Sequence, residues 1–111
     1  MDTTEFNQCL RDIFVSYASD EIGFTTTKET VDQLCDERLS PYVIDGPPNS
    51  VLTECFNAQC ELFRRAYEIG DILEYEFKDC VTTAAHTYFY DPELRHKYEE
   101  QALALITAEA A

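Results

Sequence analysis

The fold is decided most clearly by residues 50–70, which read SVLTECFNAQCELFRRAYEIG. Ser50 can cap a helix at its start, and Gly70 is well placed to end it in a left-handed conformation. The apolar residues between them recur mostly at the spacing of one helix face: Leu52, Cys55, Phe56, Phe63, Ala66 and Tyr67. The segment is therefore predicted to form a helix.

Two further helices are predicted upstream of this segment. In residues 3–19 the apolar positions again follow one helical face, and Gly23 is expected to end that segment. The pattern Thr26-x-x-Glu29 has the form of a capping box, which predicts the start of a second helix that closes before Pro41.

Residues 40–49 are predicted to form a loop. They contain three prolines and one glycine, which remove backbone donors and restrict backbone angles. The loop carries an apolar tripeptide, Tyr42-Val43-Ile44.

Two helices are predicted downstream. Asp71 restarts an apolar pattern that runs through Leu73 and Phe77 to Tyr88, and its width indicates a central helix. The fifth helix runs nearly to the C-terminus, and its start combines a cap, a first-turn proline and a first-turn acid: Asp91-Pro92-Glu93.

The fold class that follows is all-α, a bundle of about five helices in a single domain spanning residues 1–111. The chain has three glycines, and Asp45-Gly46, the one candidate hairpin turn, is followed by Pro47-Pro48, which would block a paired strand. We find no internal repeat at this level.

The charge of the chain restricts its partners. It has 22 acidic and 8 basic residues, a formal net charge of -14, yet 45% of its residues are hydrophobic, which is typical of a folded protein. Such a surface repels nucleic acid and anionic lipid, and it favours a partner with a basic surface. The acidic N-terminus lacks the features of a signal peptide, and no apolar run is long enough to cross a bilayer, so we expect a cytoplasmic protein.

The cysteines and histidines do not indicate a catalytic or metal site. Five irregularly spaced cysteines are an odd number for a disulfide framework and are predicted to be free thiols, four of them within apolar stripes. Glu93, His96 and Glu100 share a helix face, but a di-iron bundle needs two Glu-x-x-His elements. We expect no catalytic, cofactor or metal residues. An enzyme whose site forms only in the fold stays the third alternative.

Two rows of acids and the apolar tripeptide are the candidate partner-binding residues. Glu29, Asp32 and Asp36 stand at offsets of 0, 3 and 7, and Glu54, Glu61 and Glu68 are each two helical turns apart. A solvated helix face is the ordinary explanation of such rows. The complete set is Glu29, Asp32, Asp36, Glu54, Glu61, Glu68, Tyr42, Val43 and Ile44.

These observations predict a non-enzymatic, acidic protein-binding module. In size and charge it is similar to phage-encoded anti-restriction and anti-CRISPR inhibitors, and that similarity implies a nucleic-acid mimic that occupies a basic surface of a nucleic-acid-binding protein. The alternative is a structural subunit or adaptor that docks through its apolar loop. The oligomeric state stays open.

Overall fold

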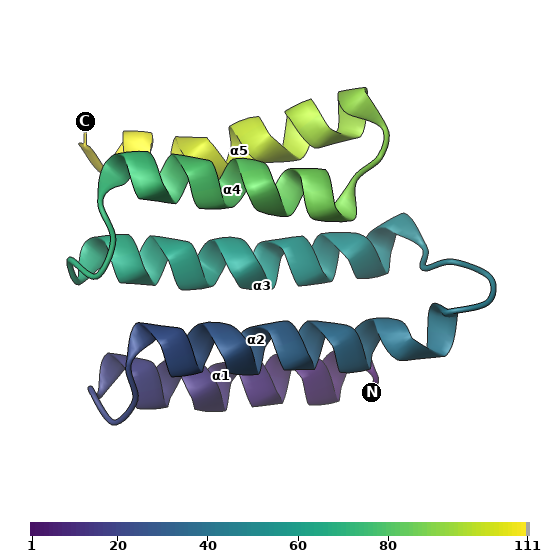
Figure 1. The fold of residues 1–111 in the computed structure, drawn as a ribbon, viewed down its shortest axis with the longest axis horizontal. Helices are drawn as coiled ribbons and strands as arrows, with labels where there is room; N and C mark the ends of the chain where they lie inside the picture. The colour runs from purple at the N-terminus through teal and green to yellow at the C-terminus, as the bar shows by residue number, and fades with distance from the viewer. Residues whose placement is uncertain (111) are drawn as a thin grey trace. The chain divides into compact units, whose positions relative to one another are not determined.

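The computed structural model describes the backbone of residues 1–110 and the side chains of residues 1–106. Over this range the protein forms five α-helices and a short 3-10 turn with no strand, which confirms the all-α prediction (Figure 1). The elements are α1 (Thr3–Ala18), α2 (Phe24–Leu39), η1 (Ser40–Tyr42), α3 (Asn49–Glu68), α4 (Glu74–Tyr88) and α5 (Pro92–Ala110). The contacts divide the chain into two units, Met1–Ala58 and Gln59–Ala111, with the division inside α3.

In the first unit α1 and α2 run antiparallel and pack side by side (Figure 1). Asp2 caps α1, because its Oδ1 accepts a hydrogen bond of 2.8 Å from the backbone N–H of Glu5. The apolar stripe predicted for this helix is confirmed, since it supplies the buried side chains of α1. The buried apolar residues of the two helices are Phe6, Leu10, Phe14, Tyr17, Val31, Leu34 and Cys35.

The α1–α2 connection differs from the prediction at both ends. The left-handed residue that ends α1 is Asp20, with φ 62°, whereas Gly23 is extended, with φ -87°. Gly23 is the N-cap of α2, so Thr26 lies inside the first turn and the predicted capping box is wrong. Thr27, a fully buried polar residue, donates its hydroxyl to the carbonyl of Gly23 at 2.8 Å. This bond satisfies the buried hydroxyl inside the core.

In the second unit α4 lies between α3 and α5 (Figure 1). The rings of Tyr67 and Phe77 are 6.1 Å apart, and Phe89 stacks on Tyr98 at 4.8 Å. The prediction for α4 needs one correction, because the helix begins at Glu74 and Leu73 at its N-cap is 58% exposed. The backbone N–H groups of Asp71 and Ile72 bond to the carbonyl of Ala66, at 2.8 and 3.4 Å, so residues 71–73 belong to the turn and not to α4.

The other predicted boundaries hold within a few residues. Helix α5 begins at Pro92, and Asp91 Oδ1 accepts from the backbone N–H of Glu93 at 2.9 Å. Gly70 ends α3 with φ 85°, as predicted. Helix α3 begins at Asn49, so Ser50 is inside it, since Pro48 already offers its carbonyl to the first turn.

The same helical hairpin occurs twice, at an interval of fifty residues. In α1–α2, Asp20 and Glu21 donate their backbone N–H groups to the carbonyls of Tyr17 and Ser16, at 3.1 and 3.0 Å. The α3–α4 turn makes the same two bonds fifty residues later. There Gly70 donates at 3.2 Å and Asp71 at 2.8 Å. Both are Schellman motifs with a left-handed residue at the same place.

The two hairpins also share residues. Matching residues 3–38 with 53–88, seven positions are identical: Thr3/Thr53, Phe6/Phe56, Asn7/Asn57, Tyr17/Tyr67, Ile22/Ile72, Lys28/Lys78 and Val31/Val81. Positions buried in both hairpins include the phenylalanine and valine pairs. Most residues nevertheless differ, so the likeness of the two hairpins lies in their turn geometry and in these seven positions.

Candidate functional site

Acidity by itself does not single out a surface. The first unit has eleven acidic and three basic residues, and the second has eleven and five. What separates the acidic residues is whether an arginine or lysine of the same chain already neutralises them. The two predicted rows differ in this respect.

The glutamates of the α3 row are all ion-paired within the chain. Glu61 contacts both Arg64 and Arg65, at 2.7 and 2.9 Å, and Glu68 contacts Arg64 from the following turn. Glu54 pairs with Arg38, at 3.0 Å. The pairs to Arg64 and Arg65 follow from helical spacing, which sequence can show. The Arg38–Glu54 pair joins two helices and carries no local sequence signal.

The α2 row is more open. Glu29 and Asp36 are exposed and make no ion pair with a described residue, whereas Asp32 contacts Lys28 four residues earlier. Glu37, beside Asp36, is also exposed. We refer to Glu29, Asp32, Asp36 and Glu37 as the acidic α2 surface.

The apolar tripeptide lies just after α2 and does not behave as one unit. Val43 and Ile44 are 81% and 95% exposed, so they form an apolar tip on the α2–α3 connection. Tyr42 is half-buried, and its hydroxyl faces the guanidinium of Arg38. Of the three predicted anchors, Val43 and Ile44 are thus available to a partner, while Tyr42 supports the ion pair below it.

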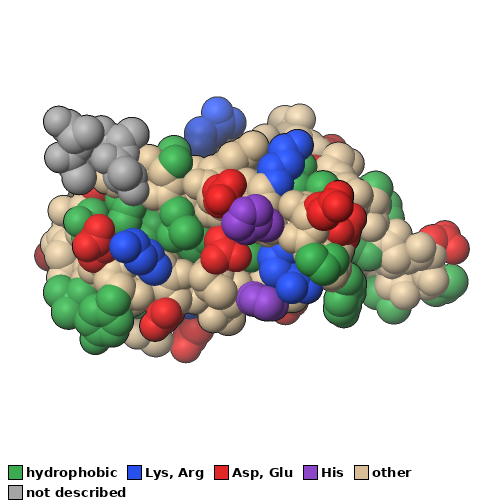
Figure 2. Space-filling model, turned by 90° about the horizontal axis from the view of Figure 1, so that it is seen from above, with side chains coloured by type: hydrophobic (Ala, Val, Ile, Leu, Met, Phe, Trp, Pro, Cys, Tyr) green, Lys and Arg blue, Asp and Glu red, His purple; other side chains and the backbone are tan. Residues whose placement is uncertain are grey.

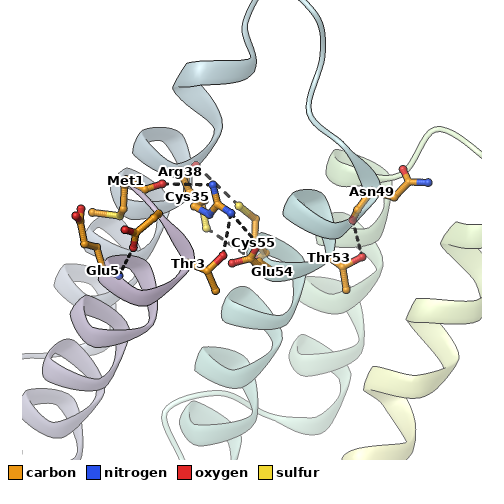
Figure 3. Close-up of polar contacts among 10 residues, drawn as sticks. Met1, Thr3, Glu5, Cys35, Arg38, Asn49, Thr53, Glu54 and Cys55 are labelled. Atoms are coloured by element: carbon orange, nitrogen blue, oxygen red, sulfur yellow. Dashed lines mark hydrogen bonds and ion pairs between the residues drawn. The ribbon is translucent and has the colours of Figure 1, made fainter.

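A polar cluster of the first unit is built around Arg38, in the last turn of α2 (Figure 3). Its side chain is 9% exposed, and it donates to Glu54 Oε2 and to Thr3 Oγ1, each at 3.0 Å, and to the carbonyl of Met1 at 3.3 Å. Burial lowers the pKa of Arg38, but hydrogen bonds to Glu54 and Tyr42 outweigh it, so the pKa is raised overall. Arg38 therefore ties α1, α2 and α3 together as a permanently charged group.

Two thiols lie beside this ion pair and face each other (Figure 3). Cys35 Sγ is 3.8 Å from the carbonyl of Cys55, and Cys55 Sγ is 3.9 Å from the carbonyl of Cys35. The contact with Cys35, together with burial, strongly raises the pKa of Cys55. Burial also raises the pKa of Cys60 to about 12. The thiols of Cys55 and Cys60 therefore stay protonated at neutral pH, which makes them poor nucleophiles.

The remaining chemical groups are on the surface. His96 Nε2 is 3.0 Å from Glu100 Oε1, and both side chains are mostly exposed. The two histidines appear on the face of α4 and α5 shown in Figure 2, next to acidic side chains. Among the described residues no three metal-binding side chains converge, and no helix is long and apolar enough to cross a membrane.

Comparison with protein-family models, with curated proteins and with solved structures finds no match for this chain. The functional argument therefore rests on the surfaces described above.

Proposed function

We propose that this protein is a non-enzymatic protein-binding module whose acidic α2 surface docks on a basic surface of a partner, one that otherwise binds nucleic acid. The observation that carries the proposal is the contrast between the two rows. The α3 row is neutralised within the chain, and in the α2 row Glu29 and Asp36 are exposed and unpaired with any described residue. Uncompensated carboxylates provide electrostatic attraction to a basic groove.

The spacing of the α2 row can be compared with that of the phosphates that a basic groove binds. With a rise of about 1.5 Å per residue, Glu29 and Asp36 are about 10 Å apart along the helix, with Asp32 between them. This array is sparser than the phosphates of one DNA strand, which follow about every 3.4 Å along the axis. A partner would therefore meet fewer charges than on DNA, and apolar contacts would have to supply part of the affinity.

Val43 and Ile44 can supply those apolar contacts. They follow the last turn of α2, so the apolar tip and Asp36 belong to the same end of the first unit. Stable interfaces combine an apolar core with a polar rim. The tip is also what favours the alternative function, an adaptor that docks through Val43 and Ile44 while its charge serves solubility.

The test is competition with nucleic acid. Basic proteins of the source organism that are retained on the immobilised chain and eluted with salt are purified, and each is bound to a fluorescent DNA or RNA duplex. We expect the protein to displace the duplex while binding no nucleic acid itself. Retention without displacement would contradict the mimic and leave the adaptor.

Matched charge reversals locate the surface. Glu29→Lys/Asp36→Lys changes the net charge by the same amount as Asp12→Lys/Glu93→Lys, which alters exposed acids elsewhere. We expect the first variant to weaken displacement at least tenfold and to flatten its salt dependence, and the second to change it much less. Equal losses would show that only net charge matters and would exclude a specific α2 surface.

A further inference from the structure

The two hairpins differ at the turn in a way that their fold does not require. In α1–α2 the positions around the turn are Ser19, Gly23 and Thr25. Their counterparts fifty residues later are Ile69, Leu73 and Tyr75, which are 57%, 58% and 64% exposed. We call these three residues the turn patch. Large apolar side chains thus stand in water where the first hairpin has small ones.

The turn patch does not stabilise the turn that carries it. Both turns make the same pair of backbone hydrogen bonds and have a left-handed residue at the same place. The N-cap residues also have nearly the same backbone angles, φ -87° and ψ 177° at Gly23 and φ -89° and ψ 166° at Leu73. The first hairpin achieves this geometry without large apolar side chains at these positions. A contact with a partner explains the exposed side chains of the turn patch better than a role in the turn does.

The surroundings of the turn patch define the charge of its partner. Residues 68–79 contain five acids and one lysine: Glu68, Asp71, Glu74, Glu76, Asp79 and Lys78. Figure 2 shows hydrophobic side chains gathered at the end of the face where α4 begins, with acidic side chains beside them. An apolar patch with an acidic rim complements an apolar surface with a basic rim. It repels both an anionic membrane and a second copy of this chain.

We propose that the turn patch binds a cationic amphipathic segment of a partner protein. Leu73 and Tyr75 contact the apolar face of that segment. Glu76 and Asp79, which make no ion pair with a described residue, pair with its lysines or arginines, whereas Glu68 and Glu74 are already paired with Arg64 and Lys78. The sign of the partner's charge follows from the acids beside the turn patch, and the place of contact is on the second unit, so the proposal is independent of the acidic α2 surface.

The test uses a defined probe, a helical peptide of about 18 residues built from Leu and Lys. Backbone amide shifts of the isotope-labelled full chain are followed during titration. We expect the largest shifts in residues 69–79, and we expect Leu73→Ser/Tyr75→Thr to weaken peptide binding at least tenfold. Val15→Thr, which alters an apolar residue that is 65% exposed on α1, is the control and should leave binding unchanged.

A transplant makes the test sharper. Gly23→Leu/Thr25→Tyr, introduced into the Leu73→Ser/Tyr75→Thr chain, rebuilds the two side chains at the α1–α2 turn. A Cβ at Gly23 meets nothing within 4 Å and the backbone there is extended, so the change is sterically permitted. We expect peptide binding to return, with the largest shifts now in residues 19–29.

Three outcomes would overturn the proposal: shifts centred outside residues 69–79, no saturable binding of the peptide, or binding to phosphatidylserine vesicles in place of the peptide. None of them bears on displacement of nucleic acid by the acidic α2 surface. The two proposals therefore fail separately.

Discussion

The hairpins α1–α2 and α3–α4 have the same turn geometry and mostly different side chains. They share the turn geometry and the buried phenylalanine and valine pairs, Phe6/Phe56 and Val31/Val81. They differ in the left-handed residue, in the exposed side chains at the turn, and in the contents of their cores. The shared turn geometry shows what this helix connection needs in order to form. The differences indicate which residues serve another purpose.

The internal ion pair is the clearest structural difference. In the first hairpin Arg38 is buried near the end of α2 and paired with Glu54, whereas the second hairpin has Tyr88 at the matching position. A partly buried ion pair gains little net stability over an apolar pair, but it is costly to break. We therefore interpret Arg38 as a group that fixes which residues of α1, α2 and α3 meet.

The largest expected effect tests the two matched buried phenylalanines. Phe6→Ala and Phe56→Ala each remove a phenylalanine that is at most 1% exposed, so each should lower the free energy of unfolding by about 3–5 kcal/mol. Urea unfolding followed by circular dichroism measures both. If one of the two substitutions lowers the free energy of unfolding by less than about 1 kcal/mol, the two positions are not equivalent, and the likeness of the hairpins is limited to their turns.

The next effect concerns the ion pair. Glu54→Ala leaves Arg38 buried without its carboxylate and should cost about 3 kcal/mol in urea unfolding. The double variant Arg38→Met/Glu54→Leu removes both charges and should recover most of that loss. If the double variant is as unstable as Glu54→Ala, the two side chains contribute to stability in another way than by neutralising each other's charge.

A third effect concerns the pH dependence of stability, because a matched buried position holds a thiol in one hairpin and a leucine in the other. Cys60, whose pKa is raised to about 12, stands where the first hairpin has Leu10. The unfolded thiol loses its proton near pH 9 and the folded one does not, so stability is complete below pH 9 and falls as the pH rises towards 12. The loss from this thiol should reach about 1 kcal/mol by pH 10.

Unfolding free energies from pH 7 to pH 10.5 measure this loss. Cys60→Ala should show a smaller loss over the same interval, because it lacks the titrating group. An identical pH profile for parent and variant would place the alkaline transition on other groups.

A smaller effect tests the left-handed position of the two turns. Gly70→Ala puts a Cβ on a residue with φ 85° and should cost about 1 kcal/mol. Asp20→Gly makes the opposite change at φ 62° and should stabilise by about 0.5 kcal/mol. Shifts in melting temperature of opposite sign are expected. Shifts of the same sign would contradict the equivalence of the two turns.

The smallest effect is expected at the turn patch. Leu73→Ser/Tyr75→Thr replaces exposed side chains that the first hairpin lacks, so losing them should lower the free energy of unfolding by less than about 0.5 kcal/mol. Serine is a preferred N-cap residue and offsets this loss, so the variant is expected to be at least as stable as the parent. A larger loss, measured by the same urea titration, would show that the patch packs within the fold.

The helices of this protein could be predicted from its sequence, because they depend on local signals. Apolar residues at the helical period mark all five, and Asp91, Pro92 and Gly70 act at helix ends through their own backbone chemistry. The boundary at Gly23 was wrong for a related reason: a glycine can end one helix or cap the next, and sequence alone does not distinguish them.

Only the tertiary structure decided that Glu54 is paired with an arginine of another helix. Glu29 and Glu54 look alike in sequence, yet Glu54 meets Arg38 from another helix and Glu29 meets no basic residue that the structure describes. Pairing between helices depends on how their faces pack, which helical spacing within one segment does not encode. The likeness of the two turns became visible for the same reason, since it lies in backbone geometry and most of the residues of the two hairpins differ. Sequence thus determined the helices, and packing determined which charges and which apolar side chains are left for a partner.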